Sequence, residues 1–178
     1  MTHPRKIIRD AAVTLLTGAT SAGTRVTPTR VEPHKKTDLP AISVYTLSEA
    51  TVDDNDGAAP RELTRVVNLE ITGWVAHVAT LPADDAMDAL AAQIEAAMDA
   101  DPYLGGAAGD SILQGTELTI IDDGDPLVGV VTLTYAVTFR TTPGDPADPD
   151  DFLLAGVTTQ VGGAGLDNAV EDLIEVQT

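Results

Sequence analysis

The stretch Leu127-Val-Gly-Val-Val-Thr-Leu-Thr-Tyr-Ala-Val-Thr-Phe-Arg140 is the strongest strand signal in the 178-residue chain. Large apolar residues alternate with threonines, which is the two-residue period of a strand with one buried face. Threonines 132, 134 and 138 help to form the opposite face. The stretch therefore predicts a long, half-buried strand. The expected inward residues are Leu127, Val131, Leu133, Tyr135, Val137 and Phe139.

A second strand is expected just upstream, over residues 112–121, with Leu118 and Ile120 facing inward. The acidic sequence Asp122-Asp-Gly-Asp125 is typical of a turn. Residues 112–121 and 127–140 together predict a long antiparallel hairpin.

Further upstream, residues 63–78 alternate as well. Their apolar members Val67, Leu69, Ile71 and Val75 share one face, and either one long strand or two strands bent near Gly73 fits the pattern. Residues 41–47 predict another strand. Residues 24–31 contain Pro28 and predict a short or edge strand at best. Residues 48–60 are acidic and without period, which predicts a long loop.

Two helices complete the pattern. Residues 82–100 carry an apolar stripe and three aspartates near the N-terminal end, where the helix dipole favours acids. The N-terminal segment has apolar residues at helical spacing, with Pro4 suited to the first turn and Gly18 to the stop. Its apolar run is broken by Arg9 and Asp10, which argues against a signal peptide.

These elements predict an α+β fold, a mainly antiparallel sheet packed by two α-helices, followed by a C-terminal extension. The expected domain spans residues 1–141. Residues 142–151 are rich in proline and aspartate and predict a stiff linker. Residues 152–178 form the extension, with a small helix expected over 166–174. No window approaches 18 uninterrupted apolar residues, so no membrane-spanning segment is expected.

The charge is strongly acidic and unevenly placed. The chain holds 28 Asp and Glu against 10 Lys and Arg, for a formal net charge of −18. Residues 1–40 are net basic, residues 66–139 contain no Lys or Arg, and residues 141–178 contain acids and no base. A nucleic-acid binder that works by attraction of phosphate is therefore excluded. A basic N-terminal face that meets an acidic face of the same subunit or of a neighbour is one interpretation, and ordinary solvated surface is the alternative, which is favoured for any single charge.

The kind of acidity resembles that of proteins from extreme halophiles, because Asp supplies most of the acid and Lys is nearly absent. Molar salt screens carboxylate repulsion over a Debye length of roughly 3 Å. An acidic protein from a GC-rich genome is the alternative.

Motifs for catalysis or cofactors fail on inspection. Cysteine is absent, which excludes disulfides and thiolate sites. His3, His34 and His77 lie in different elements without metal-ligand spacing. The glycine-containing residues 18–24 lack the lysine of a phosphate loop. We expect no catalytic residue, no cofactor and no enzymatic activity.

The acidic loop is tested as a calcium site. With Gly57 at the sixth position of an EF-hand loop, the first and twelfth positions are Val52 and Leu63, so this motif fails. Asp53, Asp54 and Asp56 remain weak candidates for loose cation binding.

The order of elements resembles a known family. The points of contact are the strand Leu39-Pro-Ala-Ile-Ser-Val-Tyr45, the helix Asp88-Ala-Leu-Ala-Ala-Gln-Ile-Glu95 with its exit Leu104-Gly-Gly106, and the final strand Tyr135-Ala-Val-Thr-Phe-Arg140. Residues 4–141 are thus similar to the tail terminator, or tail completion, proteins of long-tailed phages, of the phage lambda minor tail protein U kind. Residues 142–178 extend beyond that pattern.

The resemblance implies a homohexameric ring at the head-proximal end of the tail tube of a virion, assembled in the host cytoplasm. The ring would stop tube polymerisation, contact the tail tube protein and the neck or head–tail connector protein, and let DNA pass as cargo through its lumen. With the acidic composition it implies a tailed virus of a halophilic host. Candidate interface residues are Arg5, Lys6, Arg9, Trp74, Tyr103 and Arg140.

Other readings stay open at this point. One is another neck or tail component, either a head–tail stopper or a tail tube subunit, although two helices argue against the tube. Another is a non-catalytic α+β ligand-binding or regulatory module. A halophilic enzyme whose site carries no motif is the third.

Overall fold

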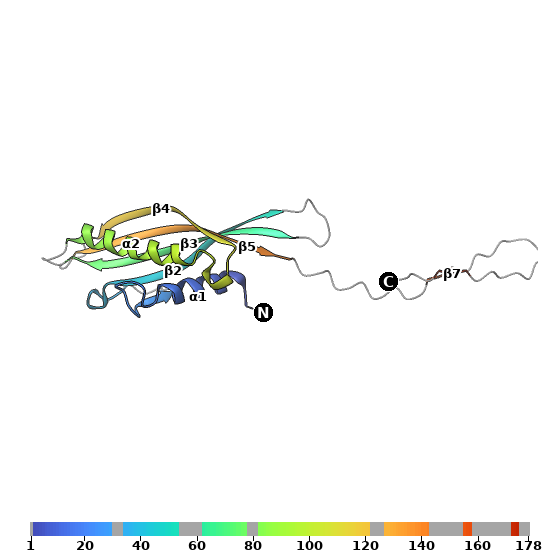
Figure 1. Ribbon diagram of the computed structural model, residues 1–178, viewed down its shortest axis with the longest axis horizontal. Helices are drawn as coiled ribbons and strands as arrows, with labels where there is room; N and C mark the ends of the chain where they lie inside the picture. The colour runs from blue at the N-terminus through green and yellow to red at the C-terminus, as the bar shows by residue number, and fades with distance from the viewer. Residues whose placement is uncertain are drawn as a thin grey trace, which may run out of the picture. The chain divides into compact units, whose positions relative to one another are not determined.

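The computed structural model of the protein describes residues 2–29, 34–53, 62–77, 82–121, 127–142, 155–157 and 172–174. Its main feature is a five-stranded sheet with the strand order β1-β2-β3-β5-β4 (Figure 1). The β1–β2 pair is parallel and the other neighbouring pairs are antiparallel. The strands are β1 (Val26–Pro28), β2 (Ala41–Asp53), β3 (Leu63–Ala76), β4 (Asp110–Ile121) and β5 (Val128–Thr141).

The buried residues of the two central strands follow the alternation seen in the sequence. Every second residue of β5 from Val131 to Phe139 is buried, and β3 buries Val67, Leu69, Ile71 and Val75 on the same face. Val67 lies opposite Val137 and Ile71 opposite Leu133 in the register, so the two central strands present one continuous apolar surface. The predicted β4–β5 hairpin is confirmed, and β3 runs through Gly73 as a single strand.

Two α-helices cover this apolar face. Helix α1 (Pro4–Leu16) buries Ile8, Ala12 and Leu16, and the backbone N–H of Arg5 donates to the His3 ring at its start. The helix ends before Gly18, whose φ of +77° is a backbone conformation that glycine adopts without strain. Proline at the first helical position needs no backbone donor there, as expected.

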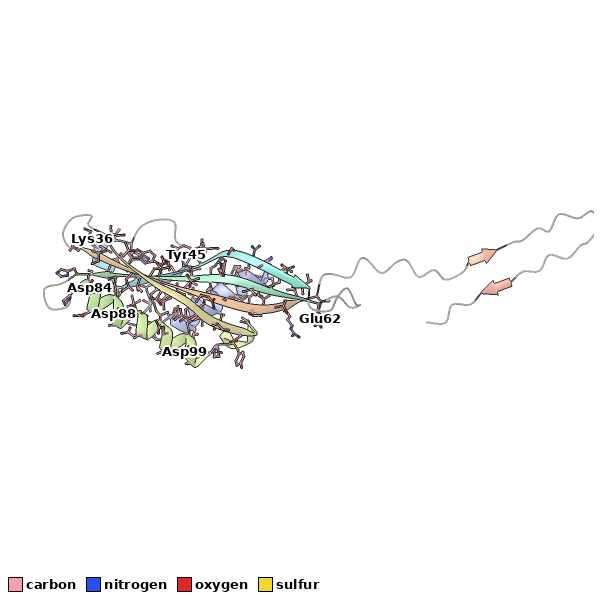
Figure 2. The ribbon with its side chains drawn as sticks, turned by 90° about the horizontal axis from the view of Figure 1, so that it is seen from above. Lys36, Tyr45, Glu62, Asp84, Asp88 and Asp99 are labelled. Carbon is pink, nitrogen blue, oxygen red and sulfur yellow. The ribbon has the colours of Figure 1, made fainter. Side chains whose placement is uncertain are left out.

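Helix α2 (Ala83–Ala100) packs mainly on β3 and β5. Its buried residues include Met87, Leu90 and Ile94, and its first turn holds Asp84 and Asp85. Seen along the edge of the sheet, α2 lies on one side, whereas Tyr45 and Lys36 lie on the other (Figure 2). Two short 3-10 helices, η1 (Lys36–Asp38) and η2 (Leu104–Gly106), occur in connections. The α+β fold class is thus confirmed.

Strand β2 is longer than the sequence indicated. Residues 48–53, expected as the start of a loop, continue the strand because β3 supplies backbone partners as far as Leu63. A bulge between Thr46 and Ser48 shifts the register, so that Glu49 lies opposite the buried Val67. The loop prediction is therefore wrong for these residues. Residues 54–60 lie outside the described part of the chain.

The chain divides into two compact units, Met1–Thr142 and Pro143–Thr178. In the second unit, β6 (Ala155–Val157) pairs antiparallel with β7 (Asp172–Ile174). The helix expected over 166–174 is wrong for its last three residues, because pairing with β6 holds them extended. The predicted linker, apart from Thr142, lies outside the described residues. No helix in the described ranges has the length and apolar character to cross a membrane.

Candidate interaction surface

The β4 edge of the sheet has no neighbouring strand among the residues that the structure describes, and its pairing with β5 is interrupted by a register shift between Leu113 and Gly115. β4 is the last strand in the sheet order, is 12 residues long and contains no Pro, Lys or Arg. Edge strands with free backbone donors and acceptors are usually blunted by such residues, because they pair readily with other chains. The opposite edge shows this protection: β1 is three residues long and includes Pro28, which has no N–H to donate. The two edges are therefore not equivalent.

Apolar side chains of β4 are exposed on both faces. Leu118 and Ile120, predicted to face inward, do lie on the helix side of the sheet, opposite Val131 and Gly129. They are 48% and 50% exposed, so their predicted burial is wrong. The cause is the position of α2, which packs mainly on β3 and β5 and covers this side of β4 only in part. The other large apolar residues exposed on β4 are Ile112, Leu113 and Ile121.

An acidic stripe on α2 borders the bare part of β4. Asp84, Asp88, Glu95 and Asp99 are spaced by 4, 7 and 4 residues, which places them along one side of a helix. The side chain of Gln93, on the other side of α2, accepts a hydrogen bond of 2.6 Å from the Ser21 N–H, which follows α1. The acids therefore lie on the side of α2 away from α1. Figure 2 shows Asp84, Asp88 and Asp99 along the length of the helix.

The candidate interface residues Arg5, Lys6 and Arg9 lie on α1, which packs on β1 and β2 near the edge of the sheet opposite to β4. Arg5 forms an ion pair of 3.4 Å with Glu49, without hydrogen-bond geometry at that carboxylate oxygen, and Lys6 pairs with Asp10 one turn along the helix. Arg9 is half-buried and its Nη1 donates to Thr46 Oγ1 at 3.4 Å. Near these bases Ile7 is 47% exposed. Arg5 and Arg9 thus lie on the β2 side of α1, whereas Ile7, two residues from each, lies on the other side of the helix, beside η2.

Glu49 joins α1 to two strands. Its side chain is 11% exposed and accepts a 2.7 Å hydrogen bond from Arg65 Nη1 on β3, in addition to its pair with Arg5. A carboxylate this deeply placed needs such partners, because an unpaired charge out of water is costly. No local pattern in the sequence indicates this pairing, because residues 48–60 lack the alternation of a strand.

The three remaining interface candidates lie in separate places. Trp74 of β3 packs its ring 4.6 Å from that of His34, on the side of the sheet away from the helices. Tyr103, between α2 and η2, is 58% exposed. The side chain of Arg140 is 74% exposed and lies 3.9 Å from Glu62 at the end of the β3–β5 ladder. The structure therefore gathers only Arg5, Lys6 and Arg9 into one region.

No metal site is built by the part of the chain that the structure describes. That part holds no group of three or more His, Asp or Glu side chains placed to share an ion. Among the cation candidates, the backbone of Asp53 ends β2, and Asp54 and Asp56 lie outside the described residues.

A shallow apolar groove of about 480 Å³ lies between α1 and η2. Its walls include Ile7, Ala11, Leu15, Leu104 and Ala107. The one carboxylate on its rim, Asp101, already accepts a 2.7 Å hydrogen bond from the Gly105 N–H. The groove therefore lacks the convergent free polar groups by which small-ligand sites orient their ligands.

Tyr135 is a polar residue of β5 that is buried on the helix side of the sheet. It is 1% exposed, and its hydroxyl has no hydrogen-bond partner among the residues that the structure describes. Burial is the main cause that raises the pKa of its phenol well above the usual value near 10, and the nearby charges of Glu95 and Asp99 raise it further. The phenol is thus held in its neutral form.

The sequence of β4 carries one signal of its exposure. Residues 110–121 carry apolar residues at 112 and 113 and again at 118, 120 and 121, so both faces are apolar at the two ends. A strand with one face in the core and one in water alternates instead, as β5 does.

No protein-family model matches the chain, and no curated protein matches it in sequence.

Proposed function

We propose that this protein is a structural component of a virion, which forms a ring on the end of a tail tube. The ring stops tube polymerisation, joins the tail to the neck and lets DNA pass through its lumen. It acts through surfaces and has no catalytic role. The resemblance of residues 4–141 to tail terminator proteins supplies this hypothesis, and the arrangement of the two sheet edges supports it.

The observation that carries the proposal is the difference between the β4 edge and the β1 edge. A subunit that closes into a ring contacts its two neighbours through two different surfaces. This chain has a long, open, apolar edge at β4 and a short, proline-blunted edge beside the basic helix α1. Exposed apolar residues concentrated along one strand are a mark of surfaces that become covered.

The charge suits passage of DNA. Over residues 66–139 the chain has no Lys or Arg, so a lumen formed by this part would repel phosphate and would not hold the DNA. A map of the assembled ring tests this point. Acids turned to the outer wall with arginines around the channel would contradict it.

Native mass spectrometry in high salt, together with tail tubes purified without their terminator, tests the proposed function. We expect a hexamer, or a monomer that becomes hexameric on tube ends, and tubes that stop growing when the protein is added. A chain that stays monomeric and leaves tube growth unchanged would exclude this role.

A further inference from the structure

The outer edge of β2 is covered by β1 along only part of its length. The parallel β1–β2 ladder ends at the pair Pro28–Val44, whereas β2 continues to Asp53. Among the residues that the structure describes, no strand pairs with the outer side of residues 46–53. The exposed side chains of this stretch are those of Leu47, Ser48, Ala50 and Thr51. The sheet therefore has a second open edge, on the side opposite to β4.

The free part of β2, residues 46–53, and the β4 edge share several properties. Neither contains Pro, Lys or Arg, which are residues that blunt edge strands. Each has one register shift and a straight stretch beyond it, residues 48–53 of β2 and residues 115–121 of β4. A stretch of about six residues is the usual length of a strand in a sheet. Each edge is therefore long enough for a further strand to pair along it.

The two open edges run in opposite directions. The pairs β2–β3, β3–β5 and β5–β4 are all antiparallel, so β4 is antiparallel to β2. A rotation about an axis along the strands preserves the direction of every strand. It would therefore bring β4 of one copy beside β2 of the next as an antiparallel neighbour, in the same pattern as the ladders within each copy.

We propose that the β4 edge of one copy pairs with the free part of β2 of a second copy, so that one sheet continues from subunit to subunit. Backbone N–H and C=O groups would make the contact, and the exposed side chains of Leu118, Ile120 and Ile121 would gain cross-strand neighbours. The contact is heterologous, and repeating it closes a ring or extends a filament. The inference rests on the proposed function and deepens it by naming the lateral contact of the ring, but it is tested without tail tubes.

Pairing of β4 with β4 of another copy is the main alternative. It would leave the free part of β2 open in both copies, whereas the β4–β2 contact covers both open edges. Charge separates the two arrangements as well, because α2 holds five acids and no base, whereas α1 holds three bases and one acid. Both helices lie on the same side of the sheet. A β4–β4 pair would thus turn two acidic helices towards each other, and the β4–β2 pair turns α2 towards α1.

Cross-linking in this naturally cysteine-free chain tests the contact directly. One protein carries Thr119→Cys on β4 and a second, with a different mass tag, carries Ala50→Cys on β2. Both positions are exposed and lie on the side of the sheet away from the helices. Each protein is treated with a short thiol–thiol cross-linker, alone and after mixing, and circular dichroism checks that both are folded. Ala96→Cys, at an exposed position of α2 on the helix side of the sheet, replaces Ala50→Cys in the control mixture.

The two cysteines of one copy are too far apart to be joined to each other. Ala50 aligns through Val66 with Thr138 of β5, and Thr119 aligns with Val130, eight residues away on the same strand. With about 3.3 Å per residue and about 4.8 Å between strands, their separation is about 30 Å. A chain that carries both cysteines, treated with a cross-linker shorter than this, should therefore give a ladder of cross-linked species that ends at the size of the closed ring.

We expect a cross-linked heterodimer from the mixture of the Thr119→Cys and Ala50→Cys proteins, and no dimer from either protein alone or from the control mixture. A dimer from the Thr119→Cys protein alone would overturn the proposal in favour of β4–β4 pairing. A mixture without the heterodimer would also overturn it, whatever the oligomeric state. If native mass spectrometry then still shows a hexamer, the proposed function survives and only this lateral contact fails.

Hydrogen–deuterium exchange provides a second measurement on the natural protein. Between the dissociated chain at high dilution and the assembled oligomer, we expect amide exchange to slow in residues 48–53 and in residues 115–121 together. The amides of β3 and β5 are the internal control, because both strands already have a neighbour on each side. Slower exchange in residues 115–121 without a change in residues 48–53 would contradict the proposal.

Discussion

Two glycines in the central strands, Gly73 of β3 and Gly129 of β5, let α2 lie close to the sheet. A Cβ atom built on Gly129 would lie 2.9 Å from Met87 Sδ and 3.0 Å from a methyl group of Val75. We expect Gly129→Ala to lower the free energy of unfolding by about 1–3 kcal/mol, because the site has no room for the methyl group.

Gly115→Ala is the matched control for this substitution. Gly115 also lies in a strand, but a Cβ there meets no atom within 4 Å. Its change in stability should stay within about 0.5 kcal/mol. Urea unfolding of both variants at one salt concentration makes the comparison, and equal losses would show that α2 does not depend on this close approach.

Tyr135 should make the protein sensitive to alkali. Its pKa is raised in the folded state, so the unfolded chain loses the phenolic proton first as the pH rises above about 10. The stability that the neutral phenol contributes is therefore complete below that pH and is lost above it. Tyr135→Phe should lose less stability between pH 9 and pH 11 than the natural protein, as followed by urea unfolding, whereas Tyr103→Phe, at an exposed position, should follow the natural curve.

At the scale of the elements, Glu49 of β2 links α1 to the sheet through its ion pairs with Arg5 and Arg65. Glu49→Gln removes the charge that faces Arg65 and Arg5, and Arg65 is only 27% exposed. We expect a loss of about 1–3 kcal/mol in the free energy of unfolding, since a charged hydrogen bond is weakened away from bulk water. Glu62→Gln is the control, because its pair with the 74% exposed Arg140 should contribute under about 0.5 kcal/mol.

Elements with a strict period were predictable, and those shaped by their neighbours were not. The alternation of β3 and β5 and the apolar stripes of both helices reflect burial. This pattern is visible within the sequence of each segment alone. The extension of β2 to Asp53 depends on partners in β3, and the bulge at Leu47 has no local pattern. The exposure of Leu118 depends on how far α2 reaches across the sheet, which no local pattern of β4 records. For the same reason the sequence identified the basic N-terminal segment but not the exposed apolar side chains of β4.

For the whole molecule, the carboxylate excess should make stability depend on salt. Raising KCl from about 0.1 M to about 1 M shortens the Debye length from about 10 Å to about 3 Å, so repulsion among the acids is screened. We expect the urea midpoint to rise through this range. Asp84→Asn with Asp88→Asn should show a smaller rise, and a flat curve for the natural protein would remove the case for adaptation to salt.

The second compact unit should be separable from the first. Residues 2–142 contain the complete sheet and both α-helices, and unit boundaries fall between Thr142 and Pro143. We expect a chain ending at Thr142 to unfold with the same cooperative transition but to assemble more weakly, if residues 143–178 contact a neighbouring copy. Calorimetry and native mass spectrometry measure the two properties separately, and a chain that assembles equally well without these residues would exclude that role.

The open β4 edge also bears on how newly made subunits stay apart before they assemble. Each free copy exposes a 12-residue template on which a stray strand of another chain could grow, which is the starting point of fibril formation. Mutual repulsion among highly acidic chains is the colloidal protection that remains, and it weakens as carboxylates take up protons. We therefore expect the concentrated protein to become insoluble as the pH approaches the isoelectric point near 4.1, and the proposed ring, in which that edge would be covered, to resist longer.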